Sequence, residues 1–373
     1  RGTNFSARNV EWWDRSLRNP YTMNWNASIQ YEFTRDYLIE FSYQGSAGVG
    51  LVERWQANTF PVDFAAGNPT LQNQVFAAAQ NFRPYPHFGN IFLRSNQGHS
   101  TFHSSTIKLE KRLSQGMFFN TFYTLSKCIN SQDTDNAGSG VDPLNNRALE
   151  KGRCGYDRNH RFIGVINYEL PFGKGKRWAN GGGVKNWIVS GLEISWIQTV
   201  ESGNPLTFSF ANSPYNYYPT FAGNRRPDLV STPSLNMSNW NNGGPDRFTR
   251  PQSLPAVIDI NAFAWPGGCG SVLTAVNRGG CDFRVGNAGR NTVTGPGLLW
   301  SQVSVQKNFQ ITERFKTQLR WDFQNALKTY NFTGPSTGVD FRNPQTFGKL
   351  GDDPRTASLG GQPLMNLTLM IQF

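Results

Sequence analysis

The last ten residues alternate between apolar and polar side chains more regularly than any other stretch of the chain. Their even positions from Asn366 onward are polar apart from Met370, and their odd positions are apolar: Met365, Leu367, Leu369, Ile371 and Phe373. A period of two predicts a strand with one apolar and one polar face. Roughly 9–11 residues is also the length that a tilted strand needs to cross a bilayer. A core strand of a soluble β-protein is the alternative, although a long apolar edge at a chain end favours aggregation.

Further stretches with the same period predict eight more strands. They are Tyr21–Phe33, Tyr37–Val52, Thr101–Leu113, Met117–Lys127, His160–Phe172, Trp187–Gly203, Leu298–Ile311 and Phe315–Thr329. Residues 1–19 read as a loop, and a short helix is expected at Gln72–Gln80.

The connections between these strands alternate in length. Long connections at 57–99, 129–159, 204–297 and 330–363 alternate with shorter ones at 34–36, 113–116, 173–186 and 312–314. Outer-membrane barrels show this asymmetry, with long loops outside and short turns on the periplasmic side. We therefore predict an all-β fold, an antiparallel transmembrane β-barrel, and a location in the bacterial outer membrane.

The strand count indicates part of a larger barrel. About nine strands are predicted, so the first and the last run in the same direction, whereas single-chain bacterial barrels have even numbers of strands. We therefore expect residues 1–373 to be the C-terminal part of a barrel that begins upstream.

Composition supports a barrel and argues against other classes. Aromatic residues make up 14% of the chain although hydrophobic residues reach only 38% and the mean hydropathy is −0.51. Aromatic girdles and a polar lumen produce such a profile. The formal net charge is +11, but the basic residues are scattered among acidic ones, so loops and lumen explain them better than nucleic-acid binding. Some of them are expected to meet anionic lipid headgroups.

The candidate chemistry is sparse. Residues 133–138 begin like a calcium loop, but position 144, where its bidentate acid belongs, is a leucine. His99 and His103 lie on the same face of the predicted strand, about 13 Å apart, which is too far to chelate one metal alone. We therefore predict no enzyme activity, no catalytic residues, no metal site and no cofactor.

The four cysteines suit an oxidising compartment. None forms a Cys-x-x-Cys motif, and the pairs Cys128–Cys154 and Cys269–Cys281 each fall within or bracket one long loop. Proteins exported to an oxidising compartment keep such pairs as disulfides, so both are predicted to be bridged.

Several short motifs, in order along nearly the whole chain, are similar to the Oar-like TonB-dependent receptors. They lie at 83–91, 109–113, 121–127, 157–162, 168–178, 202–206, 224–229, 286–291, 295–297, 347–349 and 353–355. The resemblance implies a barrel of 22 strands, preceded by a carboxypeptidase-regulatory-like domain and a plug that contacts the TonB complex. Neither N-terminal part is visible in this chain.

The function implied by the resemblance is energised uptake of a bulky nutrient, such as a carbohydrate or a peptide, across the outer membrane. Partners would be the TonB complex, outer-membrane lipid and lipopolysaccharide, and a ligand not named by the sequence. A barrel used for adhesion, secretion or surface assembly, or a passive porin, is the alternative. Ligand contacts are expected from loop aromatic and arginine side chains; these are Tyr215, Tyr217, Tyr218, Phe221, Arg225, Arg226, Trp240 and Trp265. The same side chains could instead pack the long loop against itself.

Overall fold

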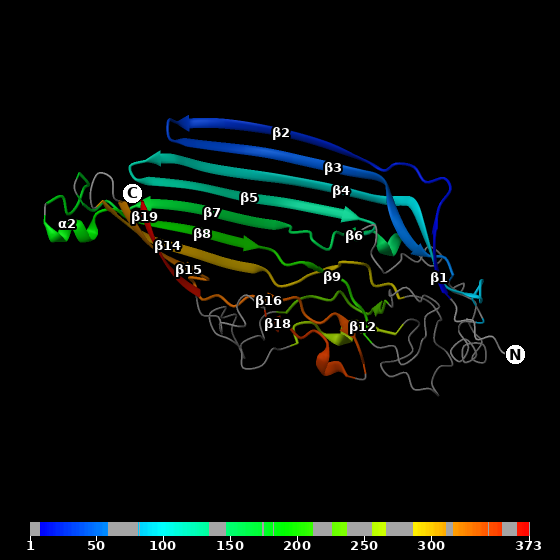
Figure 1. Ribbon diagram of the computed structural model, residues 1–373. Helices are drawn as coiled ribbons and strands as arrows, with labels where there is room; N and C mark the ends of the chain where they lie inside the picture. Colours follow the sequence, from blue (N-terminus) through cyan, green and yellow to red (C-terminus); the bar gives the residue numbers. More distant parts are fainter. Residues whose placement is uncertain are drawn as a thin grey trace.

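One large antiparallel sheet dominates the structure (Figure 1). The computed structural model describes residues 8–58, 81, 83–133, 147–173, 175–181, 183–211, 226–236, 256–265, 286–310, 316–341, 343–352 and 364–372. The sheet's nine long strands are β2 (Tyr21–Thr34), β3 (Tyr37–Gln56), β4 (Phe88–Ser114), β5 (Met117–Asn130), β7 (His160–Glu169), β8 (Leu192–Glu201), β14 (Leu298–Gln310), β15 (Lys316–Gln324) and β19 (Leu364–Gln372).

The nine strands form an up-and-down meander. Each long strand pairs with the long strands before and after it in the sequence, and β2 and β19 lie at the two edges of the sheet. Such pairing lets neighbouring strands satisfy one another's backbone N–H and C=O groups, which a membrane-spanning structure requires. All nine strands predicted from the alternating pattern are present, and the antiparallel all-β architecture is confirmed.

The strand register collects the apolar positions on one face of the sheet, called here the apolar face. Directly opposed residues on antiparallel strands share a face. One row on this face crosses six strands and reads Leu367, Trp321, Val305, Ile194, Tyr168 and Met117. A second row crosses seven strands and reads Ile29, Phe41, Ile107, Tyr123, Phe162, Val200 and Leu299. Even inside the sheet these side chains are uncovered: Phe41 is 49% and Ile107 47% exposed.

The opposite side, called here the polar face, carries the charges. One of its rows reads Asn366, Asp322, Ser304, Ser195 and Asn167. In the registered pairs of the nine long strands, short of the bulge that follows Val49, every acidic residue lies on this face: Glu32, Glu40, Glu110, Glu169, Glu193, Glu201 and Asp322. An apolar face without carboxylates and a polar face rich in them match the lipid side and the lumen side of a barrel wall.

The two ends of the sheet differ as the connection lengths predicted. At one end lie tight turns and the short helix α2 (Val184–Val189), and at the other end the long connections gather (Figure 1). The side chains of two lysines on the apolar face extend toward the short connections and place their ammonium groups there. The Lys111 Nζ donates to the carbonyls of Ser114 and Met117 at 2.9 and 3.1 Å, and the Lys307 Nζ donates to the carbonyls of Trp187 and Ser190. Both ammonium groups thus leave the apolar face at the membrane boundary.

The first long connection is shorter than the sequence indicated, because β4 begins at Phe88 and not at Thr101. The N-terminal part of β4 pairs with the end of β3 beyond irregularities near Gly50, whose φ is +65°, and Figure 1 shows β3 bending there. β1 (Arg8–Trp13), placed in a loop by the sequence, runs parallel to β4 from Phe88 to Arg94. Glu11 ties the three strands together through ion pairs to Arg94 and Arg54, with N–O distances of 2.6 and 3.5 Å.

Other predicted boundaries were also wrong. The strand expected at His160–Phe172 ends at Glu169, the one expected at Phe315–Thr329 spans Lys316–Gln324, and Trp187 lies in α2 because β8 starts only at Leu192. The predicted helix at 72–80 and turn at 312–314 fall outside the described residues. Among the residues that the structure describes, no helix is long and apolar enough to span a membrane.

The remaining elements are short and lie in the connections. They are η2 (Arg147–Glu150), β6 (Gly152–Arg153), β9 (Pro205–Leu206), β10 (Ser209–Phe210), β11 (Asp228–Leu229), η3 (Ile260–Ala262), β12 (Phe263–Ala264), β13 (Val293–Thr294), β16 (Phe332–Thr333), β17 (Gly338–Val339), η4 (Pro344–Thr346) and β18 (Gly351–Asp352).

The assignment of faces makes a direct prediction for two adjacent residues of β19. Leu367 lies opposite Trp321 on the apolar face, and Asn366 lies opposite Asp322 on the polar face. An arginine on the lipid side costs about 2–4 kcal/mol near the midplane, so Leu367→Arg should sharply reduce the yield of assembled barrel. Asn366→Arg should leave the yield near wild type because the new cation meets a carboxylate. Heat-modifiable migration of outer-membrane extracts measures both yields, and equal yields would contradict the assignment.

Candidate functional site

The long connections fold into a unit of their own, called here the loop assembly and made of the described residues of 202–297 and 325–352. Four small strand pairs hold it together: β9 with β13, β10 with β17, β11 with β12, and β16 with β18. The β10–β17 pair joins the connection after β8 to the connection after β15. These connections are therefore bound to each other and not only to the strands that they link.

A compact hydrophobic core lies inside the loop assembly. It contains Leu206, Phe208, Phe210, Val257, Ile258, Ala262, Phe263, Trp265, Val293, Tyr330, Phe332, Val339, Phe347 and Leu350. Phe208 packs against Phe263 with ring centroids 4.8 Å apart, and Phe210 stacks on Trp265 at 4.1 Å. Burial of so many aromatic rings stabilises the assembly strongly, since each buries a large apolar area.

A buried ion pair fixes the connection after β5 to the loop assembly. The Arg226 Nη2 donates to the Glu150 Oε1 at 2.7 Å, and the Arg226 Nη1 donates to the carbonyl of Ala288 at 2.9 Å. The Arg226 side chain is 2% exposed. Burial raises the pKa of Glu150 and lowers the pKa of Arg226, while the charge of each opposes the shift of the other. Each of these buried charges is therefore stabilised by the other.

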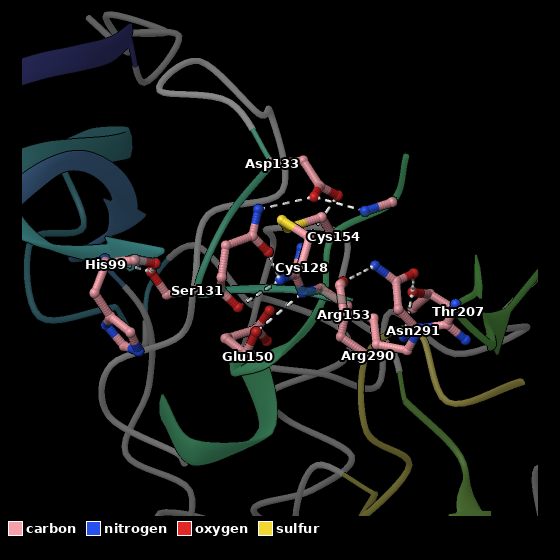
Figure 2. Close-up of polar contacts among 12 residues, drawn as sticks. His99, Cys128, Ser131, Asp133, Glu150, Arg153, Cys154, Thr207, Arg290 and Asn291 are labelled. Carbon is pink, nitrogen blue, oxygen red and sulfur yellow. Dashed lines mark hydrogen bonds and ion pairs between the residues drawn. A yellow bond between two sulfur atoms is a disulfide. The ribbon is translucent and has the colours of Figure 1, made fainter. Parts of the chain in front are cut away.

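Around the disulfide lies a polar network that joins the connection after β5 to the connection after β8 (Figure 2). The Arg290 guanidinium donates to the carbonyls of Glu150 and Asn130 at 2.9 and 2.7 Å and pairs with Asp133 at 3.1 Å. Arg153 pairs with the Asp157 carboxylate at 2.9 Å. Further members of the network are Thr294, whose hydroxyl accepts from Arg153, and Asn291, whose amide donates to the Arg153 carbonyl.

Glycine motifs allow the connections to approach closely. A Cβ on Gly203 would lie 2.0 Å from the carbonyl oxygen of Gly295, and one on Gly286 would lie 2.3 Å from the carbonyl oxygen of Pro227. Real Cβ atoms do not approach backbone atoms that closely, so only glycine fits at both positions. Motifs at 202–206 and 295–297, and those at 224–229 and 286–291, thus meet in pairs.

A cavity of about 520 Å³ lies where the loop assembly meets the ends of β8 and β14. Its lining includes Arg158, Glu201, Asn204, Phe332 and Thr333. The Glu201 carboxylate, which belongs to the polar face, pairs with Arg161 at 2.8 Å and with the Arg158 Nε at 3.5 Å. The Arg158 Nη1 is buried and has no hydrogen-bond partner among the described residues. A buried donor without a partner is uncommon in folded proteins.

The polar face offers a second hollow further along the wall. It has a volume of about 420 Å³ and is lined by Ser304, Arg320, Asp322 and Asn366, among other residues. The Arg320 Nε donates to Asp322 at 2.7 Å, and the hydroxyl of Ser304 donates to the same carboxylate. Fixed charges of both signs along a lumen wall suit the passage of hydrated, polar solutes.

The structure describes two of the eight side chains predicted to contact ligand. Arg226 is buried against Glu150, and Trp265 is 5% exposed and stacked on Phe210, so both pack the loop assembly. The other six lie outside the described residues: Tyr215, Tyr217, Tyr218, Phe221, Arg225 and Trp240. Their role in ligand binding stays a prediction.

Of the two predicted disulfides, Cys128–Cys154 is confirmed, with Cα atoms 5.3 Å apart. Cys269 and Cys281 lie outside the described residues. In the terminal strand, Leu367, Leu369 and Ile371 are 65%, 60% and 59% exposed, and Phe373 is outside the described residues.

The sequence did not single out several residues that organise this site. Arg158 and Arg290 lie inside motifs that were noted at 157–162 and 286–291, but nothing local assigned them a role. Their partners, Glu201 and Asp133, come from other connections or strands.

The buried ion pair generates a prediction with an internal control. Breaking such a pair leaves an uncompensated buried charge and costs about 3–5 kcal/mol, so Glu150→Gln should loosen the loop assembly. Limited trypsin digestion of intact outer membranes should then cut the loops several times faster than in the wild type. Glu169→Gln removes an ion pair whose side chains are both about half exposed, and it should not change the rate. Equal cleavage of the two variants would contradict a structural role for Glu150.

A comparison with protein families agrees with this architecture. Residues 1–358 match the family model described as the outer membrane beta barrel domain. The outer membrane transporter YddB from Escherichia coli superposes with a TM-score of 0.44 and 8% sequence identity, over 95% of this chain and 33% of that chain. The chain thus spans about a third of the length of that transporter. No curated protein matches the chain. The chain belongs to the outer membrane beta barrel domain family, and its location is the bacterial outer membrane.

Proposed function

We propose that this chain forms the C-terminal part of a TonB-dependent receptor that takes up a bulky nutrient across the outer membrane. The cavity beside Arg158 carries the proposal, because it joins the loop assembly to the polar face of the sheet. A ligand bound by the loops would, in this cavity, also contact the polar face of the sheet, along which it must pass to cross the membrane. The motif resemblance to Oar-like receptors supports energised transport and a barrel of 22 strands.

The chemistry of the cavity favours a ligand rich in oxygen. Arg158 supplies a buried N–H without a partner among the described residues, and the Glu201 carboxylate can accept hydrogen bonds from hydroxyl or amide groups. Phe332 adds an apolar ring to the lining. A volume of about 520 Å³ accommodates one end of an oligosaccharide or a peptide, which are the two ligand classes that we propose.

Energised uptake is tested with the full-length receptor produced in cells. Uptake of fluorescent oligosaccharides and peptides into cells should be measured before and after the proton gradient is collapsed. We expect uptake of at least one probe to stop when the gradient is lost, because the TonB complex depends on it. Uptake that continues unchanged would favour a passive porin, and binding without uptake would favour adhesion or surface assembly.

The role of the cavity is tested by Arg158→Gln in the same cells. Loss of a charged hydrogen bond to ligand costs about 1.5–3 kcal/mol, so the probe concentration for half-maximal uptake should rise by roughly tenfold or more. Arg177→Gln is the matched control, because Arg177 lies among the short connections, where its guanidinium contacts the Trp178 ring. If Arg158→Gln and Arg177→Gln transport alike, the cavity is not the binding site.

A further inference from the structure

The apolar face carries basic and aromatic side chains at its long-loop end that neither the fold nor transport explains. They form a group called here the outer cluster: Tyr43, His99, His103, Tyr123, Lys127 and His160. Three of the four histidines in the chain belong to it. His99, His103, Lys127 and His160 are all exposed.

Tyrosine hydroxyls orient two of the imidazoles. The Tyr43 Oη lies 2.7 Å from the His103 Nδ1, and the Tyr123 Oη lies 2.8 Å from the His160 Nδ1. In both pairs the rings are stacked, with centroids 6.2 and 6.3 Å apart. Each Nδ1 is engaged by its tyrosine, so Nε2 is the ring nitrogen left to meet a ligand.

Two further contacts shape the cluster around His103. Lys127 is directly opposite His103 in the register of β4 and β5. The Trp25 ring lies 6.0 Å from the His103 ring, and it passes over Gly45, where a Cβ would come within 2.2 Å of the indole. Gly45 therefore makes room for an aromatic platform beside a lysine and an imidazole.

The position of the cluster matches the outer boundary of the membrane. His103 and Lys111 are eight residues apart on β4, which corresponds to about 27 Å along the strand and about 20 Å along the membrane normal at the usual tilt. His99 lies about 13 Å further along the strand. An apolar band about 25 Å tall thus ends between His103 and His99. Long loops face outside in such barrels, so the cluster lies at the outer leaflet.

Charge complementarity identifies the occupant. Short of the bulge that follows Val49, no Asp or Glu shares the apolar face in the registered pairs of the nine strands. Lys111 and Lys307, at the opposite end, are bound to backbone carbonyls, whereas the Lys127 ammonium makes no hydrogen bond or ion pair with the described residues. An ammonium that the described residues leave unpaired, imidazole N–H groups and tyrosine and tryptophan rings suit phosphate groups carried on sugar rings.

We propose that the outer cluster is a binding site for the phosphorylated glycolipid of the outer leaflet. Lys127 meets a phosphate, the His103 and His160 Nε2 atoms add hydrogen bonds, and Trp25 and the tyrosines lie against the sugar. The acyl chains of the lipid cover the apolar rows that continue below, including Ile107 and Phe41. This site is independent of the transported ligand, because it lies on the opposite face of the sheet from Glu201.

The proposal is tested by lipid retention on the purified receptor, measured by native mass spectrometry after addition of bisphosphorylated lipid A. Removing a charged hydrogen-bond donor costs about 1.5–3 kcal/mol, so Lys127→Gln combined with His103→Gln should lower retention by about tenfold or more. Lys316→Gln removes one cation from the polar face of β15 and should retain lipid as the wild type does. Dephosphorylated lipid A and phosphatidylglycerol should be held weakly by the wild-type protein.

Unchanged retention by the double variant would overturn the proposal, as would equal retention of dephosphorylated lipid A or of phosphatidylglycerol. Heat-modifiable migration confirms that each variant is folded before it is measured. If the double variant does not assemble, Tyr43→Phe removes only the hydroxyl that orients His103. That variant should also retain less bisphosphorylated lipid A, and wild-type retention by it would count against the site.

Discussion

The structure depends on one constraint, which is that the two faces of a single sheet must suit two different surroundings. Lipid offers no partner for a carboxylate or for an unpaired backbone group. The nine long strands meet this constraint by pairing in sequence order and, short of the bulge that follows Val49, by keeping every registered acidic side chain on the polar face. A shift of register by one residue would carry Asp322 or Glu193 into lipid, so the pairing is specified all along the sheet.

The long connections solve a different problem, since they leave the membrane and need a core of their own. Aromatic residues from the connections after β8 and β15 provide it, and the buried pair of Glu150 and Arg226 adds the connection after β5. The disulfide and Arg290 fasten this unit to the end of β5. The cavity next to Arg158 then lies between the loop assembly and the polar wall.

Periodicity was sufficient to predict the strands of the sheet, because alternation is imposed locally by the two surroundings. Periodicity failed to predict structure where the chain no longer has lipid on one side and water on the other. Beyond Val49 the β3–β4 hairpin continues outside the apolar band, so residues 88–99 lose the alternating pattern and were read as loop. In α2 the apolar run around Trp187 continues into β8 and hid the helix. The loop assembly could not be predicted, because Arg226 and Glu150 are brought together by contacts between residues far apart in the sequence, and the motif glycines mark close approaches without naming the partner.

The division of the sheet into a lipid face and a water face is the central claim, and β15 tests it most directly. Single reporter cysteines can be placed at each position from Thr317 to Phe323, with the native cysteines replaced by serine, in receptor assembled in outer membranes. Reaction with a water-soluble maleimide is measured at each position. The account predicts alternation: Gln318, Arg320 and Asp322 positions react, whereas Thr317, Leu319, Trp321 and Phe323 positions are protected by lipid. Uniform reaction along β15, or the opposite alternation, would contradict it.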